Sequence, residues 1–526
     1  MKVILKSYTK IIILFFISIK AYGFNNDSSI VKYANTIKAE DLKKHLYTIA
    51  SEDFEGRETG MEGQRKAADY LTNYFSNLGL KPGNNGSFLQ NFPLISYIPE
   101  GVKLEINGNK YTPGIDFSYF LTNFNDSVLL NKDILFLGYG IQDTLYNDYN
   151  NIDVNNKLLV VLDGEPINEG KYLLTGNEEP SEWSINFKKK IYKSYEKGAL
   201  GILIIKNLLP ENVKHFMDKN RMKLDVEEKT TKTIYSFFIN KELGNNLLSQ
   251  ANTSIEKVQD KINKTGKTQN FKIKSNVKIE VKSAIRRLDS DNVMAFIEGT
   301  DLKDEVLVLT AHYDHLGIKD GEVFVGADDD GSGTVTLMEL AEAFINAKKE
   351  GNGPRRSILF MPLSGEEKGL LGSEYYSQNP VYPFSNIIAD LNIDMIGRVD
   401  NTHRNDSDFI YLIGSDKLSS ELHQISENAN NKYTNLKLDY TYNKPGDPNR
   451  FYYRSDHYNF AKHNVPIIFY FNGVHDDYHK VTDTPDKIAY GLMEKRAKLV
   501  FYTAWELVNR KERIKLDLVN DLNKDN

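Results

Sequence analysis

Short apolar runs alternate with longer helix-like stretches between Asn292 and Asn509, and this alternation restricts the fold more than any other feature. The apolar runs cover residues 293–297, 306–310, 357–362, 388–393, 409–413 and 465–470, and the helix-like stretches cover 334–349, 371–378, 418–429 and 492–509. Strands that alternate with helices form a parallel or mixed sheet with helices on both faces. We therefore predict an α/β fold with a mixed, mostly parallel sheet, in which ligands bind beyond the carboxyl ends of the strands.

The segment that precedes this region also contains helical patterns. A helix is predicted over residues 39–50, followed by a glycine-punctuated loop over 53–60. A second, amphipathic helix follows, with Ala67, Leu71, Phe75 and Leu78 at three- and four-residue spacing and Gly79 as its C-terminal cap. We assign residues 24–100 and 285–515 to one domain that is divided by an insertion.

The inserted segment, residues 101–284, shows a different sequence pattern. Strand-like runs at 133–138, 158–162, 201–205 and 233–239 alternate with polar stretches, and a helix is predicted over 189–198. We interpret Ser254 to Lys282, which is polar and rich in lysine, as a strand-and-loop return. The insert has one histidine, His215, and no cluster of metal-binding residue types. It is predicted to be a separate, β-rich domain.

The two ends of the chain differ from the rest in their sequence pattern. Lys2, Lys6 and Lys10 precede a short apolar stretch at 11–19, and Ala21-Tyr22-Gly23 offers small residues for cleavage. We predict a signal peptide over residues 1–23, with an uncleaved membrane anchor as the alternative. Residues 516–526 are a polar tail. An exported protein, periplasmic or extracellular and without a membrane span after cleavage, is expected.

Composition removes several classes of chemistry. The chain of 526 residues contains no cysteine, which excludes disulfides, thiol nucleophiles and thiolate metal sites. Its formal net charge is −6, and its basic residues are scattered, so nucleic acid is not an expected partner. Any metal must be held mainly by histidine, aspartate and glutamate.

Five short segments of the second half are rich in these residue types. They are His312-Tyr-Asp314, Gly326-Ala-Asp328-Asp329-Asp330, Gly365-Glu366-Glu367, Asn392-Ile-Asp394 and Tyr478-His479. Zinc accepts imidazole and carboxylate ligands at neutral pH. Each segment alone has an ordinary explanation, such as a surface loop, a helix-capping cluster, a calcium loop or a solvated pair of glutamates. Their joint order at strand ends and loops points to a hydrolase with two metal ions.

The residue types divide into roles. We assign His312 as a ligand with Asp314 as the partner that orients its ring, and His315 as non-ligating. One of Asp328, Asp329 and Asp330 can bridge two metals, and the residue types alone do not distinguish among them. In the pair Glu366-Glu367, one carboxylate can bind metal while its neighbour acts as general base.

As a set, these segments resemble metallopeptidase family 28, the di-zinc aminopeptidases of the leucyl aminopeptidase and aminopeptidase Y type. The resemblance rests on the five segments together with Gly331-Ser-Gly333, Lys368 to Ser373, Met395 to Gly397 and Asp483-Thr-Pro-Asp486, and it covers residues 40–100 and 285–510. It implies two zinc ions per chain, one held by His312 and Asp394 and one by Glu367 and His479. It further implies that Asp329 bridges them, that Glu366 is the general base and that the Asp329–Asp330 peptide is cis.

The insert resembles a protease-associated domain. Gly198 to Ile205 is similar to the helix-to-strand turn of that domain, and Asn156 to Gly164 is similar to one of its core strands. Both patterns are short.

The function that these observations predict is a secreted zinc aminopeptidase acting on peptides. A carboxypeptidase or glutaminyl cyclase on the same scaffold, and a receptor-like ectodomain without catalysis, are the alternatives. Arg450 and Arg454 could meet a substrate carboxylate, although a solvated loop is the simpler interpretation of Tyr442 to Arg454, and His457 could support the site or contact substrate. The oligomeric state and the side-chain preference stay open.

Overall fold

A computed structural model describes residues 27–121, 126–207, 221–226, 235–444 and 446–520. The predicted signal peptide, His215 and the end of the polar tail lie outside the described residues. Contacts within the chain divide it into two compact units. The first unit comprises Met1–Gln90, Asn292–Glu366 and Tyr376–Asn526, and the second comprises Asn91–Asp291 and Glu367–Tyr375. No helix among the described residues is long and apolar enough to cross a membrane.

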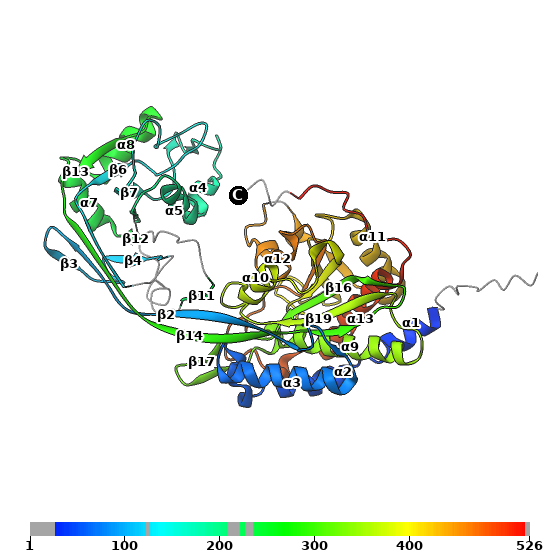
Figure 1. Ribbon diagram of the computed structural model, residues 1–526. Coiled ribbons are helices and arrows are strands. Elements are labelled where there is room, and N and C mark those ends of the chain that lie inside the picture. The colour runs from blue at the N-terminus through cyan, green and yellow to red at the C-terminus, as the bar shows by residue number, and fades with distance from the viewer. Residues whose placement is uncertain (1–26, 122–125, 208–220, 227–234, 445, 521–526) are drawn as a thin grey trace, which may run out of the picture. The chain divides into compact units, whose positions relative to one another are not determined.

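The first unit is built on an eight-stranded sheet (Figure 1). In spatial order its strands are β1 (Lys81–Pro82), β15 (Ala295–Ile297), β19 (Arg356–Leu363), β16 (Leu302–His312), β20 (Ile387–Ile393), β23 (Ile467–Phe471), β21 (Phe409–Ile413) and β22 (Lys437–Asp439). The four central strands β19, β16, β20 and β23 are parallel to one another. On one side β15 pairs antiparallel with β19, and on the other side β21 pairs antiparallel with β23. The predicted mixed, mostly parallel sheet is confirmed.

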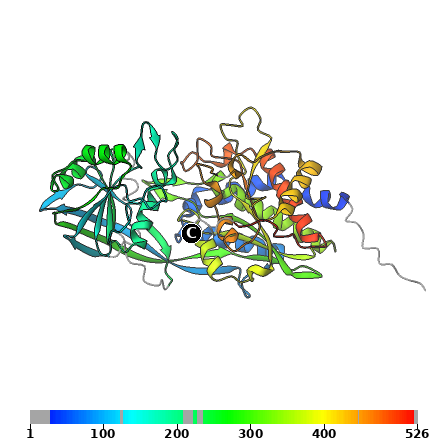
Figure 2. The same cartoon turned by 90° about the horizontal axis from the view of Figure 1, so that it is seen from above.

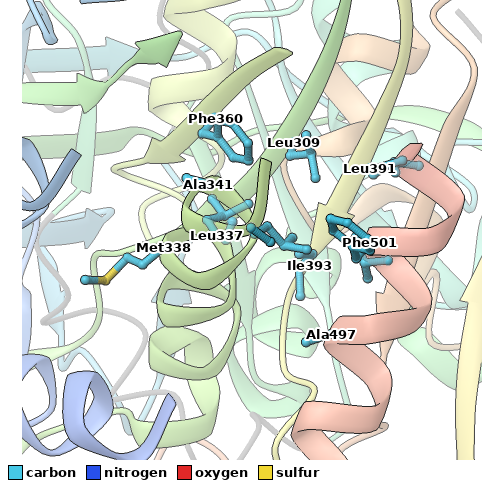
Figure 3. Packing of buried hydrophobic residues seen from close by; sticks show 14 of the residues in the cluster. Leu309, Leu337, Met338, Ala341, Phe360, Leu391, Ile393, Ala497 and Phe501 are labelled. Carbon is cyan, nitrogen blue, oxygen red and sulfur yellow. The ribbon is translucent and has the colours of Figure 1, made fainter. Parts of the chain in front are cut away.

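Helices cover both faces of this sheet because its strands are apolar on both sides. Leu307 and Leu309 of β16 belong to one buried cluster, whereas Val306 and Val308 belong to another on the opposite face. The first cluster packs against α9 (Gly333–Lys349) and α13 (Tyr490–Asn509). Figure 3 shows part of this packing, with the labelled side chains Leu309, Leu337, Met338, Ala341, Phe360, Leu391, Ile393, Ala497 and Phe501.

The N-terminal helices join the same cluster. They are α1 (Asp27–Ala34), α2 (Ala39–Ile49) and α3 (Glu62–Leu78). The amphipathic face predicted for α3 is confirmed, since Ala67, Leu71 and Phe75 are buried and Gly79 ends the helix with a left-handed φ of 88°. The remaining elements of this unit are the hairpin β17 (Gly317–Lys319) and β18 (Glu322–Phe324), α11 (Ser420–Ala429) and α12 (His457–Ala461).

The second unit contains two sheets. The six-stranded sheet has the order β13 (Asn270–Ile273), β6 (Ile134–Leu137), β7 (Leu158–Leu162), β10 (Gly201–Ile205), β12 (Tyr235–Ile239) and β4 (Phe117–Tyr119). The second sheet holds β11 (Arg221–Leu224), β2 (Leu89–Ile106), β14 (Val277–Val293), β5 (Ser127–Asn131) and β3 (Asn109–Tyr111), and a small hairpin is formed by β8 (Ile167–Asn168) and β9 (Lys171–Tyr172). The helices are α4 (Glu182–Ile185), α5 (Phe187–Glu196), α7 (Lys241–Ser249), α8 (Ile255–Thr265) and α10 (Leu371–Gln378), whose last residues belong to the first unit.

The interpretation of Ser254 to Lys282 as a strand-and-loop return was wrong for its first half. Residues 255–265 form helix α8, which Figure 2 shows from above in green. Ile255, Val258 and Ile262 are buried at helical spacing, and the Ser254 side chain caps the helix by accepting from the Lys257 backbone N–H. The many lysines on the outer face hide this pattern in the composition.

A buried carboxyl on α9 makes the stability of the first unit dependent on pH. Glu339 is 2% exposed, and its carboxylate lies 3.8 Å from Nε2 of His45. Burial, together with the nearby Glu342 and Asp41, raises the pKa of Glu339 to about 8. Between its ordinary value and that pH, the folded chain keeps a proton that the unfolded chain has lost, so stability falls as pH rises.

We expect Glu339→Gln to reduce this dependence. The fall in the thermal midpoint between about pH 5 and about pH 8 should be smaller by several degrees, because the amide has no proton to lose. Thermal unfolding followed by circular dichroism at both pH values measures the difference. Glu40→Gln, at an exposed site of α2, is the control and should retain the wild-type slope. Equal slopes for Glu339→Gln and the wild type would contradict the assignment.

Candidate metal centre

Three adjacent aspartates separate into three environments in the turn before α9. The Asp328 carboxylate accepts from the Gly397 backbone N–H at 2.7 Å and lies 3.1 Å from Nε2 of His475. The Asp330 carboxylate accepts backbone N–H groups of His312, Gly333 and Met395 at 2.9–3.1 Å. Both therefore tie the loops of the site together. The Asp329–Asp330 peptide is cis, as the resemblance implied.

Asp329 alone faces both His312, at the end of β16, and His479, in the loop after β23. Its Oδ1 lies 3.2 Å from Nε2 of His312, and its Oδ2 lies 3.0 Å from Nε2 of His479. Burial alone would raise the pKa of Asp329, but these two contacts hold it well below the ordinary value. A carboxylate that presents one oxygen to each of two histidines has the geometry of a bridging ligand.

Asp394 completes a group of three donors. His312, Asp329 and Asp394 each offer a ligand atom within 4.8 Å of the others, and all three are buried. Nε2 of His312 lies 3.7 Å from Oδ1 of Asp394. Two donors about 2.0–2.1 Å from one zinc ion at a tetrahedral angle lie about 3.3 Å apart. The spacing and the nitrogen and oxygen donor set therefore fit zinc.

The ring of His312 is held in place from its other side. Nδ1 of His312 lies 3.0 Å from the main-chain oxygen of Asp314 and 3.7 Å from its carboxylate. The Asp314 carboxylate in turn accepts from the Thr59 hydroxyl at 2.7 Å and from the Glu366 backbone N–H at 3.2 Å. Asp314 thus orients His312 through its carbonyl and fixes the turn that carries Glu366. With Nδ1 directed at this carbonyl, Nε2 is the ring nitrogen available to a metal.

The neighbouring residues Glu366 and Glu367 follow shortly after the end of β19. Oε2 of Glu366 lies 3.8 Å from Nε2 of His312, and its side chain is 13% exposed. Glu366 and Asp394 raise the pKa of His312 well above its ordinary value, whereas burial alone would lower it. Glu367 is the next residue and is the first residue of the segment Glu367–Tyr375, which belongs to the second unit. Its part in metal binding stays a prediction.

His315 lies beside the site, although we interpreted it as non-ligating. Its Nδ1 is 3.8 Å from Oδ2 of Asp329, and its ring centroid is 5.9 Å from that of His479. Gly326 permits this arrangement, because a Cβ at that residue would lie 2.5 Å from the His315 ring and 2.3 Å from the Asp329 carbonyl. The non-ligating role of His315 stays a prediction.

Several supporting residues were missed in the sequence. Arg57 is fully buried and donates to the carbonyls of Ile49, Tyr313, Val325 and Gly326 at 2.7–2.9 Å. Asp483 accepts the backbone N–H groups of Asp328 and Asp329 at 3.0–3.2 Å. Burial and the adjacent Asp328 raise the pKa of Asp483 to about 6. The arginine in the loop at 53–60 was visible in the sequence, but no local pattern marks it as buried.

A pocket of about 340 Å³, partly open to solvent, adjoins the donor group. Besides His312, Asp329, Glu366 and Asp394 it is lined by Met395, Phe451, Arg454, Phe469, Phe471, Val474 and Tyr478. Arg454 donates to the Tyr478 hydroxyl at 3.3 Å and stands over the Phe451 ring. Arg454 thus lines the pocket while its side chain stays exposed, as the interpretation of a solvated loop implies, whereas Arg450 lies over the Tyr453 ring and is not a lining residue.

His457 is neither a ligand nor a lining residue. It is fully buried, its ring stacks on Phe469 at 4.8 Å, and its Nε2 lies 2.9 Å from the Tyr452 carbonyl. Burial lowers the pKa of His457 to about 3, which keeps the ring neutral. Its role is to support Phe469, one wall of the pocket.

The part of the chain that holds the donor group is similar to known sequences. Residues 292–504 match the sequence profile of peptidase family M28. These residues form a peptidase family M28 domain. The resemblance seen in the five segments is thereby confirmed.

Relatives of the M28 domain include fungal proteins. A probable leucine aminopeptidase of Arthroderma otae is 30% identical over 223 residues, which are 41% of this chain and 57% of that protein. Leucine aminopeptidase 1 of Fusarium vanettenii is 30% identical over 231 residues, 43% of this chain and 52% of that protein. The chain thus spans just over half the length of the curated relatives it matches.

The solved structure of an aminopeptidase from Aneurinibacillus sp. strain AM-1 resembles the chain with a TM-score of 0.57 at 18% identity. The similarity covers 93% of this chain and 98% of that one, and it supports the fold. The assignment of the insert as a protease-associated domain stays a prediction.

Proposed function

We propose that the protein is a zinc-dependent exopeptidase that removes N-terminal residues from peptides with two zinc ions per chain. The observation that carries this proposal is Asp329, whose two oxygens face His312 and His479 at 3.2 and 3.0 Å. The M28 domain and relatives named as leucine aminopeptidases support it. In this assignment His312 and Asp394 hold one ion, Glu367 and His479 hold the other, and Asp329 bridges them.

Zinc in such a site supplies a Lewis acid for the scissile carbonyl and lowers the pKa of water. The protein supplies the proton transfer and the positioning. Glu366 stands 3.8 Å from Nε2 of His312 and is not one of the three donors, so we assign its carboxylate to take a proton from water and return it to the leaving amine. Asp314 holds both His312 and Glu366 in position through the contacts described above.

The pocket wall suits an apolar substrate side chain. The ring centroid of Phe471 lies 4.9 Å from that of Phe451 and 5.1 Å from that of Phe469, and Met395 and Val474 also line the pocket. We infer a preference for N-terminal residues whose side chains contact this wall beside Val474, the most exposed of these apolar residues.

The test of the activity compares metal-free and zinc-restored protein on one set of peptides. We expect dialysis against a chelator to abolish hydrolysis and about two equivalents of zinc to restore it. Mass spectrometry of the products should show loss of single N-terminal residues from a free peptide and no change in the N-acetylated peptide. Release from the C-terminus would favour a carboxypeptidase, and formation of pyroglutamate with one zinc per chain would favour a cyclase. Zinc binding without any product would favour a receptor-like protein.

We also propose that the protein is exported, on the basis of the basic and apolar pattern of residues 1–23. Expression in a bacterial host followed by N-terminal sequencing of the exported fraction tests this proposal. A mature chain beginning at Phe24 is expected, whereas retention of the intact N-terminus in the membrane fraction would indicate an uncleaved anchor.

A further inference from the structure

The basic residues are scattered over most of the chain, but one part of the second unit is an exception. Residues 250–282 contain eight lysines and three acidic residues, although the whole chain carries a net charge of −6. A concentration of positive charge creates a local field that attracts anionic partners.

Four of these lysines line a groove in the second unit. The groove has a volume of about 1050 Å³, which includes space open to solvent. One wall is α8, with Lys257 and Lys261, and the other is the segment that contains β13, with Lys272 and Lys274. All four lysines are exposed.

The acidic residues of α8 do not neutralise this charge. Glu256 pairs with Lys241 at 2.7 Å, and Asp260 pairs with Lys264 at 2.8 Å, both away from the groove. Among the described residues, none of the four groove lysines has a carboxylate partner within 4.0 Å. The groove therefore presents a positive field that a partner with several carboxylates would satisfy.

The groove also follows the free edge of a sheet. β13 is the terminal strand of the six-stranded sheet and pairs with β6 on one side only within the described residues. An edge strand presents backbone N–H and C=O groups that an added strand can pair with. Between the walls, Val258 and Phe271 supply apolar contact surface, and the Phe271 ring is held by stacking on Phe136 at 4.8 Å. A helix facing an edge strand across a groove is a form used to bind extended peptides by strand addition.

We propose that this groove binds an extended, acidic peptide segment that adds as a strand to β13. Its backbone pairs with the free edge of β13, its carboxylates meet Lys257, Lys261, Lys272 and Lys274, and its apolar side chains rest on Val258 and Phe271. Backbone pairing and the apolar floor favour a peptide over other polyanions, since nucleic acids and polysaccharides have no strand edge to offer. The site is separate from the M28 domain in sequence, and binding to it requires no hydrolysis.

The test is fluorescence anisotropy of a labelled ten-residue peptide that alternates glutamate with valine, added to the full-length protein. The peptide is N-acetylated and C-amidated, so that an exopeptidase cannot remove residues from either end. We expect saturable binding that weakens with salt and that falls about tenfold or more when the four groove lysines are replaced by glutamate. The variant Lys110→Glu/Lys171→Glu, at exposed sites of the same unit outside the groove, is the charge-reversal control and should bind at least half as tightly as the wild type.

The mode of binding is tested with the peptide. A version N-methylated at every residue keeps the charge but cannot donate a backbone N–H along either edge, and we expect its affinity to drop about tenfold or more. Equal binding of the methylated and unmethylated peptides, equal binding of heparin, or an equal loss in the control variant would each overturn the proposal. If the groove variant unfolds, as seen by circular dichroism, Lys257→Gln/Lys261→Gln replaces it, and unchanged affinity there would equally overturn it.

Discussion

Replacement of Glu366 by glutamine is expected to stop peptide hydrolysis while zinc stays bound. The amide keeps the shape of the side chain but cannot take up a proton, and general-base catalysis contributes about 10²–10⁴-fold to such reactions. We therefore expect kcat to fall by that factor with little change in KM. The backbone N–H of Glu366 that reaches Asp314 is unaffected by the change, so the turn should keep its shape.

Glu367→Gln is the matched partner of this experiment, because the two residues are chemically identical neighbours. We expect it to lower the zinc content of the purified protein, since a neutral amide is a poor zinc ligand. Elemental analysis and kcat measured on the same preparations separate the two roles. The assignment would be contradicted by wild-type turnover in Glu366→Gln, or by loss of zinc in Glu366→Gln with full retention in Glu367→Gln.

Loss of the buried guanidinium of Arg57 is expected to destabilise the first unit by about 3–5 kcal/mol. Arg57 donates to four main-chain carbonyls, and burial lowers its pKa to about 10, so it stays charged at neutral pH. In Arg57→Met these carbonyls lose their donor, and the nearby Asp314 and Asp329 lose a compensating charge. Two of the carbonyls, those of Tyr313 and Gly326, belong to the loops that carry His312 and Asp329, so zinc affinity should fall with stability.

Two further variants grade this effect. Arg57→Lys keeps the charge but offers at most three donors, so its stability should lie between that of Arg57→Met and the wild type. Arg65→Met removes an exposed arginine that pairs with Glu62 at 3.2 Å and should change stability by less than about 1 kcal/mol. Denaturant unfolding followed by tryptophan fluorescence gives the midpoints. If Arg57→Met and Arg65→Met unfold at the same denaturant concentration, the carbonyl contacts contribute little.

Much of the fold could be predicted because its signals are local. The central strands are largely apolar runs, and α3 shows helical spacing with a glycine cap, so neither needs information from distant residues. Helix α8 was missed because its three buried residues are spread through a lysine-rich segment. A pattern with few apolar residues is outweighed by composition when only the sequence is considered.

The donor residues could be identified by type, but the choice among them needed three dimensions. Nothing local distinguishes Asp329 from Asp328 and Asp330, and only the resemblance singled it out. In the structure the choice follows from what each carboxylate faces: His475 and Gly397 for Asp328, backbone N–H groups for Asp330, and the two histidines His312 and His479 for Asp329. Arg57 and Asp483 act over long sequence separations, and no periodicity reports such contacts.

The chain leaves the first unit after Gln90 and re-enters it at Asn292, and these two side chains are hydrogen-bonded to each other at 3.0 Å. The segment Asn91–Asp291 thus leaves the first unit and returns to it at two adjacent residues. A short bridge of a few residues between these points would close the chain at a small entropic cost, because closure entropy grows slowly with loop length. Removal of Asn91–Asp291 would therefore need one cut-and-join at one location, and it would leave Glu367–Tyr375, which belongs to the second unit, without the rest of that unit.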